Sequence, residues 1–275
     1  MPAKKSIVYD LEGNATKEID LPEHFDTPLR PDLIKRDVLS IQSARRQPYG
    51  RDPMAGKRNS AESWGVGRAV SRVPRVKGSR THASNRGAFV PQAVGGRVAF
   101  EPRPRSFKEK INRKERQLAI RSAIAATADQ VIVEIRGHVI NDIPSLPLIV
   151  DNSFESLTKT KEVIEALANL GICWTNKKEE AEGGLRDVER AKKRESKVRS
   201  GKGKRRGRRY KNGTSILIVY STDSGIYKAS RNISGVDVRE VTQLNTELLA
   251  PGTHPGRLVL WTEAAIEKLS QGLYS

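Results

Sequence analysis

Apolar residues recur along the chain with two spacings, one typical of strands and one typical of helices. Near the N-terminus, two strand-like runs flank a turn that contains glycine, which predicts a hairpin of Ile7–Asp10 with Lys17–Leu21. Helical spacing then predicts a helix that begins at Pro31 and ends before Pro48.

A second helix is predicted after Asn112, an N-cap residue with Glu115 in the position of a capping box, and it continues to Ala128. Beyond it, short apolar runs alternate with helical patterns. The expected strands and helices are, in chain order, Leu148–Val150, helix Thr160–Leu170, Ile172–Trp174, a helix from about Lys177, Ser215–Tyr220, helix Tyr227–Arg231, Val236–Val238, Arg257–Trp261 and helix Thr262–Leu273.

The strands expected after residue 148 are short and mainly apolar, without the polar alternation of a sheet that has one face in water. This pattern is typical of a parallel sheet covered by helices on both faces. The sequence therefore predicts one α/β domain of the doubly wound, Rossmann-like kind with a mostly parallel sheet.

One long segment has neither pattern. Residues 43–105 contain no Leu or Ile but eight Gly and six Pro, so we expect this segment to be disordered or extended when it is alone in water. Predicted helices flank it on both sides, which indicates an insertion in a domain formed by residues 1–42 and 106–275.

Charge is distributed as unevenly as the apolar residues. The chain has 50 Lys and Arg against 32 Asp and Glu, a net charge of +18. Residues 43–105, the first basic tract, carry +11, and residues 186–211, the second basic tract, carry another +11 within the globular part. The other 186 residues carry −4, so an anionic polymer is expected to bind the two tracts.

The composition of the tracts favours RNA as that polymer. Arg outnumbers Lys by twelve to two in the first tract, which favours forked and stacked contacts, and Tyr49, Trp64, Phe89 and Phe100 offer stacking faces for bases. The second tract could be a nuclear-import signal, a heparin-like patch or an RNA-binding arm; Gly mixed with Arg before Tyr210 favours the arm.

The residues predicted to bind rRNA are basic, aromatic or histidine side chains of the two tracts. They are Arg45, Arg46, Tyr49, Arg51, Lys57, Arg58, Trp64, Arg68, Arg72, Arg75, Lys77, Arg80, His82, Arg86, Arg97, Arg103, Arg105, Lys202, Lys204, Arg205, Arg206, Arg208 and Arg209.

A nucleotide-dependent enzyme, such as an RNA methyltransferase, has little support. The GxG spacings at residues 65–67 and 201–203 follow no strand, and residues 50–57 have five residues between the glycines where a phosphate loop has four. We therefore expect no bound cofactor and no catalytic residue.

Other candidate sites have simpler interpretations. The four histidines, at positions 24, 82, 138 and 254, are scattered and suggest no metal site. Asp10, Asp20 and Asp151 near strand ends are interpreted as turn or capping carboxylates rather than catalytic acids. Cys173, the lone cysteine, is expected to be a buried apolar residue.

The chain also lacks targeting features. No apolar run approaches the length of a membrane span and no secretory signal is visible, so a soluble, intracellular protein is expected. In that setting, the three asparagines that begin glycosylation sequons are interpreted as turn residues; they are Asn14, Asn212 and Asn232.

Several motifs resemble the universal L-four family of large-subunit ribosomal proteins, in its archaeal type. They lie in the first basic tract and in the predicted domain, and span nearly the whole chain. The motifs are residues 48–50, 58–68, 73–75, 90–97, 114–123, 231–236 and 244–252.

This resemblance implies a protein without catalytic activity on the large ribosomal subunit in the cytoplasm, with 23S-type rRNA and neighbouring ribosomal proteins as partners. It implies early binding during subunit assembly and a loop that enters the rRNA. The loop tip, mapped to about residues 58–77, is expected to line the exit tunnel and contact the nascent peptide, through Ser63, Trp64, Gly65, Val66, Gly67 and Arg68.

Two rival hypotheses remain open from the residues alone. An RNA-modifying enzyme would use the basic tracts for docking and would bind S-adenosylmethionine or a nucleotide. A DNA-packing protein would bind duplex DNA as tightly as folded rRNA.

Overall fold

A computed structural model describes residues 5–173, 186–195 and 197–274 of the protein. The chain forms two units: residues 1–42 with 110–275, here called the globular unit, and residues 43–109, here called the loop unit. No helix in the described part is long and apolar enough to cross a membrane.

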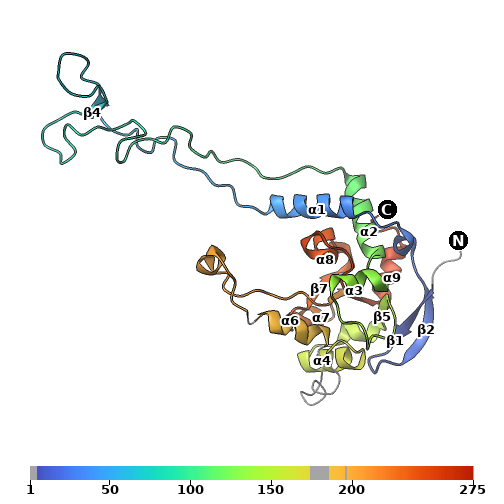
Figure 1. Cartoon of the computed structure of the whole chain (residues 1–275). Coiled ribbons are helices and arrows are strands. Elements are labelled where there is room, and N and C mark those ends of the chain that lie inside the picture. The colour runs from blue at the N-terminus through green and yellow to red at the C-terminus, as the bar shows by residue number, and fades with distance from the viewer. Residues whose placement is uncertain (1–4, 174–185, 196, 275) are drawn as a thin grey trace. The chain divides into compact units, whose positions relative to one another are not determined.

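A six-stranded sheet organises the globular unit, in the order β2-β1-β5-β8-β6-β7; Figure 1 labels β1, β2, β5 and β7. Only β1 and β2 pair antiparallel; the other neighbours are parallel, with Val8 opposite Ile149 and Ile149 opposite Trp261. The strands are β1 (Lys5–Tyr9), β2 (Ala15–Asp20), β5 (Leu148–Val150), β6 (Leu217–Tyr220), β7 (Asp237–Glu240) and β8 (Val259–Thr262). The prediction of an α/β domain with a mostly parallel sheet is confirmed.

Alternate residues of the central strands enter two separate hydrophobic cores. Ile218 and Leu260 belong to one core, whereas Leu217, Val219 and Trp261 belong to the other. Successive side chains of a strand point to opposite faces, so both faces of this sheet are buried. This explains why β5, β6 and most of β8 are continuous apolar runs.

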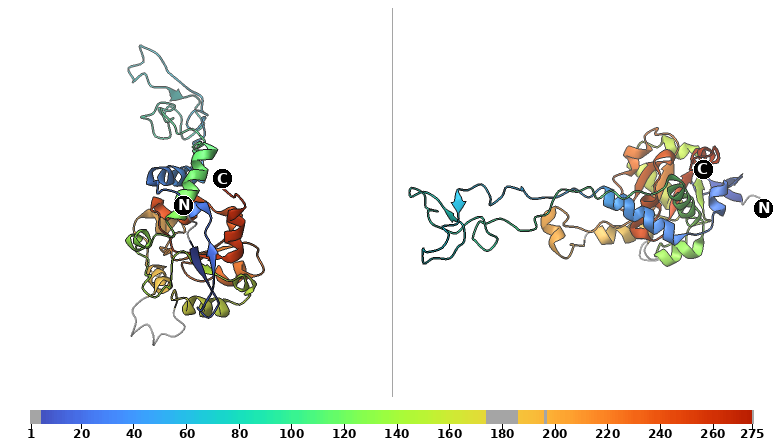
Figure 2. Two further views of the ribbon diagram at one scale, coloured as in Figure 1. Left: turned by 90° about the vertical axis from the view of Figure 1, so that its right-hand side faces the viewer. Right: turned by 90° about the horizontal axis from the view of Figure 1, so that it is seen from above.

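Helices supply the other half of each core (Figure 2). Packed in the core with Ile218 are α3 (Gln130–Arg136), α4 (Thr160–Asn169), α6 (Asp187–Glu195) and α7 (Ile226–Ser230). Packed in the core with Trp261 are α1 (Pro31–Ala44), α2 (Arg113–Ala125), α8 (Thr246–Leu249) and α9 (Glu263–Ser270). Short 3-10 turns complete the unit: η1 (Glu23–Asp26), η2 (Asn152–Ser156), η3 (Lys202–Arg206), η4 (Val241–Gln243) and η5 (Pro251–Thr253).

Two local predictions are wrong. Ile172 and Cys173 are buried but form no strand, because both backbone amides donate to the Leu167 carbonyl and thereby end α4. Asn112 precedes α2 without a side-chain capping bond, and the Glu115 carboxylate instead accepts from Arg36, 3.2 Å away on α1.

Helix α3 and helix α8 have no counterpart in the predictions. The sequence of α3 contains Val131, Ile132, Val133 and Ile135, residues typical of strands. The Asp129 side chain accepts from the backbone amides of Val131 and Ile132, and this cap supports a helix instead. The helix predicted from about Lys177 and the residue Trp174 fall outside the described residues, which resume at α6.

The loop unit has little regular structure of its own. It contains one short antiparallel pair, β3 (Ala61–Glu62) with β4 (Arg75–Val76), and none of residues 43–105 is buried. A segment without Leu or Ile has too few large apolar side chains to form a core, so turns and side-chain contacts have to fix its conformation.

Candidate nucleic-acid interface

Cationic and aromatic side chains gather around Phe107 at the foot of the loop unit. The guanidinium groups of Arg46 and Arg105 lie 4.3 and 5.0 Å from the centre of the Phe107 ring. The Tyr49 ring stacks on it at 6.1 Å, and the Ser43 hydroxyl donates to the Phe107 carbonyl at 2.6 Å. Cation–π contacts of this kind hold both ends of the first basic tract together.

Above this cluster, a backbone hydrogen bond from Arg51 to the Pro102 carbonyl, 3.0 Å long, joins the two legs of the tract. The Arg58 guanidinium pairs with the Asp52 carboxylate, which also accepts from the Met54 amide. This hydrogen bonding lowers the pKa of Asp52, so its charge remains beside the tract at neutral pH.

The predicted tip forms the hairpin of β3 and β4. Lys77 pairs with Glu62, and the Ser63 hydroxyl donates to the Arg72 carbonyl at 3.1 Å. Trp64 lies on the turn of this hairpin with Arg68 and Arg75 at 6.0 and 5.7 Å from its ring. The six residues 63–68, predicted to line the tunnel, therefore lie in the loop 63–74 that joins β3 to β4, and Val66 is 74% exposed there.

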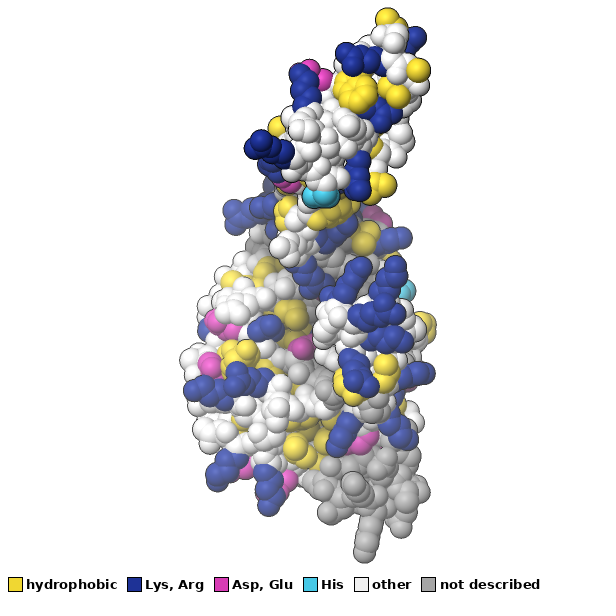
Figure 3. Space-filling model, turned by 90° about the vertical axis from the view of Figure 1, so that its left-hand side faces the viewer, with side chains coloured by type: hydrophobic (Ala, Val, Ile, Leu, Met, Phe, Trp, Pro, Cys, Tyr) yellow, Lys and Arg dark blue, Asp and Glu magenta, His cyan; other side chains and the backbone are white. Residues whose placement is uncertain are grey.

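Some guanidinium groups of the loop unit have no hydrogen bond, ion pair or ring contact within the described residues. Four of them have no partner in the part of the chain that the structure describes: Arg72, Arg80, Arg86 and Arg103. Of the predicted aromatic faces, Tyr49 and Phe100 are 63% and 96% exposed. Lys and Arg side chains, with few Asp and Glu among them, cover much of the face drawn in Figure 3. These groups are available to phosphates and bases.

The second basic tract contains a hairpin, residues 197–211, here called the basic hairpin. Its two legs are joined by an isolated bridge between Val198 and Tyr210, in which the Arg199 amide donates to the Arg209 carbonyl at 2.7 Å and the Lys211 amide to the Lys197 carbonyl at 3.0 Å. The tip is the 3-10 turn η3, and the predicted contact residues there and on the return strand are exposed: Lys202, Lys204, Arg205, Arg206, Arg208 and Arg209.

A buried carboxylate fixes the start of this tract to the globular unit. Asp187 is fully buried at the beginning of α6 and accepts from His138 Nδ1 at 3.0 Å, from the Ser215 hydroxyl at 2.5 Å and from Arg190 at 2.8 Å. Burial acts to raise the pKa of Asp187, but the hydrogen bonds from His138 and Ser215 and the charge of Arg190 outweigh it and lower the pKa to about 2. Burial also lowers the pKa of His138, so a neutral imidazole donates to an ionised carboxylate.

The remaining candidate residues have structural roles. Asp10 accepts from the Leu11 amide and Asp151 from the Ser153 amide, which confirms their interpretation as turn and capping carboxylates. Cys173 is buried in the core as predicted, and its thiol donates to Glu189 at 3.2 Å. The described residues contain no group of three His, Cys, Asp or Glu side chains that could hold a metal.

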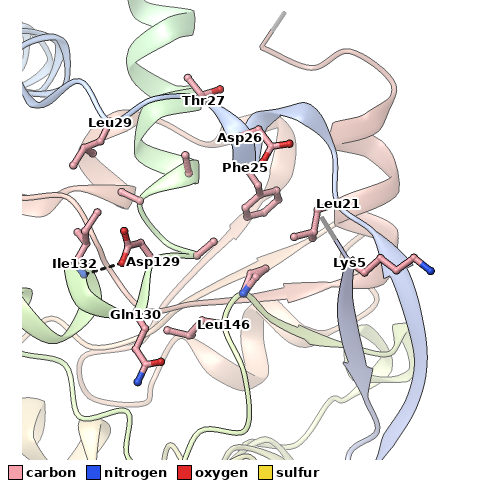
Figure 4. A pocket seen from close by; sticks show the side chains of 14 residues that line it. Lys5, Leu21, Phe25, Asp26, Thr27, Leu29, Asp129, Gln130, Ile132 and Leu146 are labelled. Atoms are coloured by element: carbon pink, nitrogen blue, oxygen red, sulfur yellow. Dashed lines mark hydrogen bonds between the residues drawn. The ribbon is translucent and has the colours of Figure 1, made fainter. Parts of the chain in front are cut away.

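A pocket of about 570 Å³ lies between η1 and the turn before α3 (Figure 4). Apolar side chains line much of it, including Leu21, Phe25 and Leu146. Two carboxylates line it: Asp129, which caps α3 and accepts from the Ile132 amide, and Asp26 of η1.

Sequence reasoning identified the charged side chains but missed their internal partners. Phe107 was not predicted because it lies just outside the first basic tract and is uncharged. The His138–Asp187 pair joins residues 49 positions apart, and no local spacing indicates it. His82 is exposed in the loop unit, and its contact with RNA stays a prediction.

Comparison with known proteins identifies the family. The ribosomal protein L4/L1 family matches residues 19–272. The chain is 52% identical to the large ribosomal subunit protein uL4 of Methanosphaera stadtmanae over 95% of both chains. It is 50% identical to the protein of the same name from Methanopyrus kandleri, over 97% of this chain and 98% of that one, and 48% identical to that of Archaeoglobus fulgidus, over 98% and 99%.

These relatives are archaeal, as the resemblance implied, and the family consists of ribosomal proteins without catalytic activity. The rival of an RNA-modifying enzyme is therefore not supported. The chain, with its paired basic tracts on an α/β domain, belongs to the ribosomal protein L4/L1 family.

Proposed function

We propose that this protein is a structural constituent of the large ribosomal subunit and binds 23S-type rRNA with its two basic tracts. The observation that carries the proposal is the near-full-length similarity to three proteins named for that subunit. The charge distribution supports it independently, because each tract carries +11 whereas the rest of the chain carries −4.

The tracts act by neutralising phosphates where rRNA segments crowd together. Guanidinium groups such as those of Arg72 and Arg80 contact phosphates in pairs of hydrogen bonds and release counterions. Because the loop unit buries no residue between 43 and 105, RNA supplies the surface on which this tract takes its final conformation. A segment that orders on RNA suits a protein that binds early in assembly, before the surrounding rRNA has closed.

The turn of the β3–β4 hairpin is the part proposed to line the nascent-peptide exit tunnel. Ser63 to Arg68 lie together on this turn, with Trp64 flanked by two arginines. The exposed Val66 offers a passing peptide an apolar contact, beside the Trp64 ring and the guanidinium groups of Arg68 and Arg75. The globular unit then adjoins other proteins of the subunit.

The test is the sedimentation of a tagged copy of the chain in an archaeal lysate on a sucrose gradient. We expect the tagged chain in the large-subunit and 70S peaks, and a shift to the large-subunit peak alone at low magnesium, when the subunits separate. Its absence from the large-subunit peak would overturn the proposal. A tagged copy lacking residues 50–100 serves as the matched control and is expected at the top of the gradient.

A further inference from the structure

A polar pocket lies at the foot of the basic hairpin. It measures about 350 Å³, within the range of sites that bind small ligands or single nucleotides. Two turns line it: residues 212–214, where the chain returns from the basic hairpin, and residues 231–237, between α7 and β7. The second turn contains residues 231–236, one of the motifs that resemble the family. None of the contacts described above gives this motif a role.

The polar side chains of this pocket have unused hydrogen-bonding capacity. No hydrogen bond to the described protein occupies the side chains of Asn212, Thr214, Asn232 and Ser234. Asn212, Thr214 and Asn232 are exposed, and Ser234 is half-buried. Together they offer two amides and two hydroxyls, groups that both donate and accept.

The floor of the pocket is rigid. Gly213 and Gly235 pack against Ala191 of α6, and a Cβ atom at these two positions would lie 2.4 Å from the Ala191 carbonyl oxygen and 2.6 Å from its Cβ. The Ser215 amide donates to the Gly235 carbonyl at 2.8 Å, which joins the two turns. The site is therefore formed before any ligand binds.

The charges around the pocket favour one orientation of a nucleotide. Asp237 lies at its edge, and a bare carboxylate repels phosphate; one of its oxygens accepts from Arg257 at 2.5 Å, and the other can accept from a ribose hydroxyl or a base amino group. Arg231 is exposed on the other turn, and Lys211 precedes Asn212 directly, so both can bind the flanking phosphates.

We propose that this pocket binds a single unpaired ribonucleotide of the RNA strand that the basic hairpin holds. The inference rests on the proposed function and adds a site that recognises the ribose and the base edge, next to a hairpin whose exposed side chains are mainly cations that bind phosphate. Hydrogen bonds to ribose and base raise the affinity without releasing counterions. Each phosphate contact of the hairpin raises the affinity by releasing counterions.

This difference gives the experiment. Full-length chain is titrated by filter binding against transcribed large-subunit rRNA of Methanosphaera stadtmanae at several salt concentrations. The pocket variant is Asn212→Ala with Asn232→Ala, and the hairpin variant is Lys204→Ala with Arg206→Ala. The matched control, Thr222→Ala with Ser224→Ala, changes two exposed side chains beyond the other end of β6.

The pocket variant is expected to bind about tenfold more weakly at every salt concentration, since two hydrogen bonds are lost, with the salt slope of the wild type. The hairpin variant is expected to reduce the slope by about two, and the control to match the wild type. The proposed ribonucleotide site is overturned if the pocket variant binds as tightly as the wild type with an unchanged thermal midpoint. It is also overturned if the pocket variant lowers the salt slope. Absence of binding by the wild type would instead overturn the proposed function itself.

Discussion

Arginine side chains have different surroundings in the globular unit and in the loop unit. Arg257 is 1% exposed and donates to the carbonyls of Ser215, Leu248 and Ile216 and to the Asp237 carboxylate. Arg80, in the loop unit, has no partner among the described residues. The same residue type therefore stabilises the fold in one unit and is available to a ligand in the other.

The comparison teaches that net charge alone is a poor guide to function, because it counts cations that the protein already uses. In the globular unit, Arg136 donates to the backbone carbonyls of His254 and Pro251, and Arg190 contacts Asp187. In the loop unit several arginines lie against aromatic rings, as Arg46 and Arg105 do at Phe107, and a cation–π contact uses the face of the guanidinium rather than its N–H groups.

The largest expected effect is the loss of rRNA binding when the loop unit is shortened. Removing residues 50–100 is expected to weaken rRNA binding by about a thousandfold or more at moderate salt, because most of the phosphate contacts are lost. The globular unit should keep its free energy of unfolding, since this segment contributes no buried side chain. Filter binding and urea unfolding of the same preparation measure the two effects, and loss of cooperative unfolding would contradict the account.

The next largest expected effect is a loss of stability when a buried arginine of the globular unit is replaced. Arg257→Ala is expected to lower the free energy of unfolding by roughly 3–5 kcal/mol, because the variant removes the buried guanidinium that donates to the Ser215 carbonyl and pairs with the Asp237 carboxylate. Arg86→Ala is the matched control in the loop unit and should leave the unfolding curve unchanged. Equal effects of the two substitutions on urea unfolding would remove the distinction between the units.

A smaller effect depends on pH. The pKa of Asp187 is lowered in the folded protein to about 2, so its contribution is present above the ordinary pKa near 4 and is lost as the pH falls toward 2, about 2 kcal/mol in all. The pKa of His138 is also lowered, so stability should already decline as the pH falls below the ordinary histidine value of about 6.5. Thermal melting from pH 7 to pH 3 measures both. Asp187→Asn should flatten the lower part of this profile, and an unchanged profile would show that the carboxylate does not anchor the second tract.

The smallest effect concerns one unpartnered cation. Arg80→Ala is expected to reduce the slope of log affinity against log salt by about one and to weaken rRNA binding a few-fold, with no change in stability. Lys161→Ala, on the exposed side of α4, controls for a general loss of charge. A larger loss of slope for Lys161 than for Arg80 would place the RNA on the globular unit.

The sequence predicted the parts of the fold that local patterns determine. Apolar runs such as those of β5, β6 and β8 were visible because both faces of the sheet are buried. Helix α3 was missed because its residues favour strands, and only the cap at Asp129 shows why it is a helix. Ile172 resembled a strand residue, yet its amide ends a helix through a contact that no spacing reveals.

The candidate interface could likewise be predicted only in part. Its cations could be found by counting, because a charged tract is a property of the sequence. The Phe107 cluster, the Asp187 anchor and the pocket at Asn212 and Asn232 depend on residues that only folding brings together. Which arginines have partners inside the protein is therefore a question that the three-dimensional structure answers.

The most direct test of this division is photo-crosslinking of the protein to rRNA in purified large subunits, with the crosslinked peptides identified by mass spectrometry. We predict crosslinks within residues 43–105, within the basic hairpin and at the two turns of the pocket at its foot. Crosslinks concentrated on the exposed faces of α3, α4 and α9, with none in the loop unit, would contradict the account.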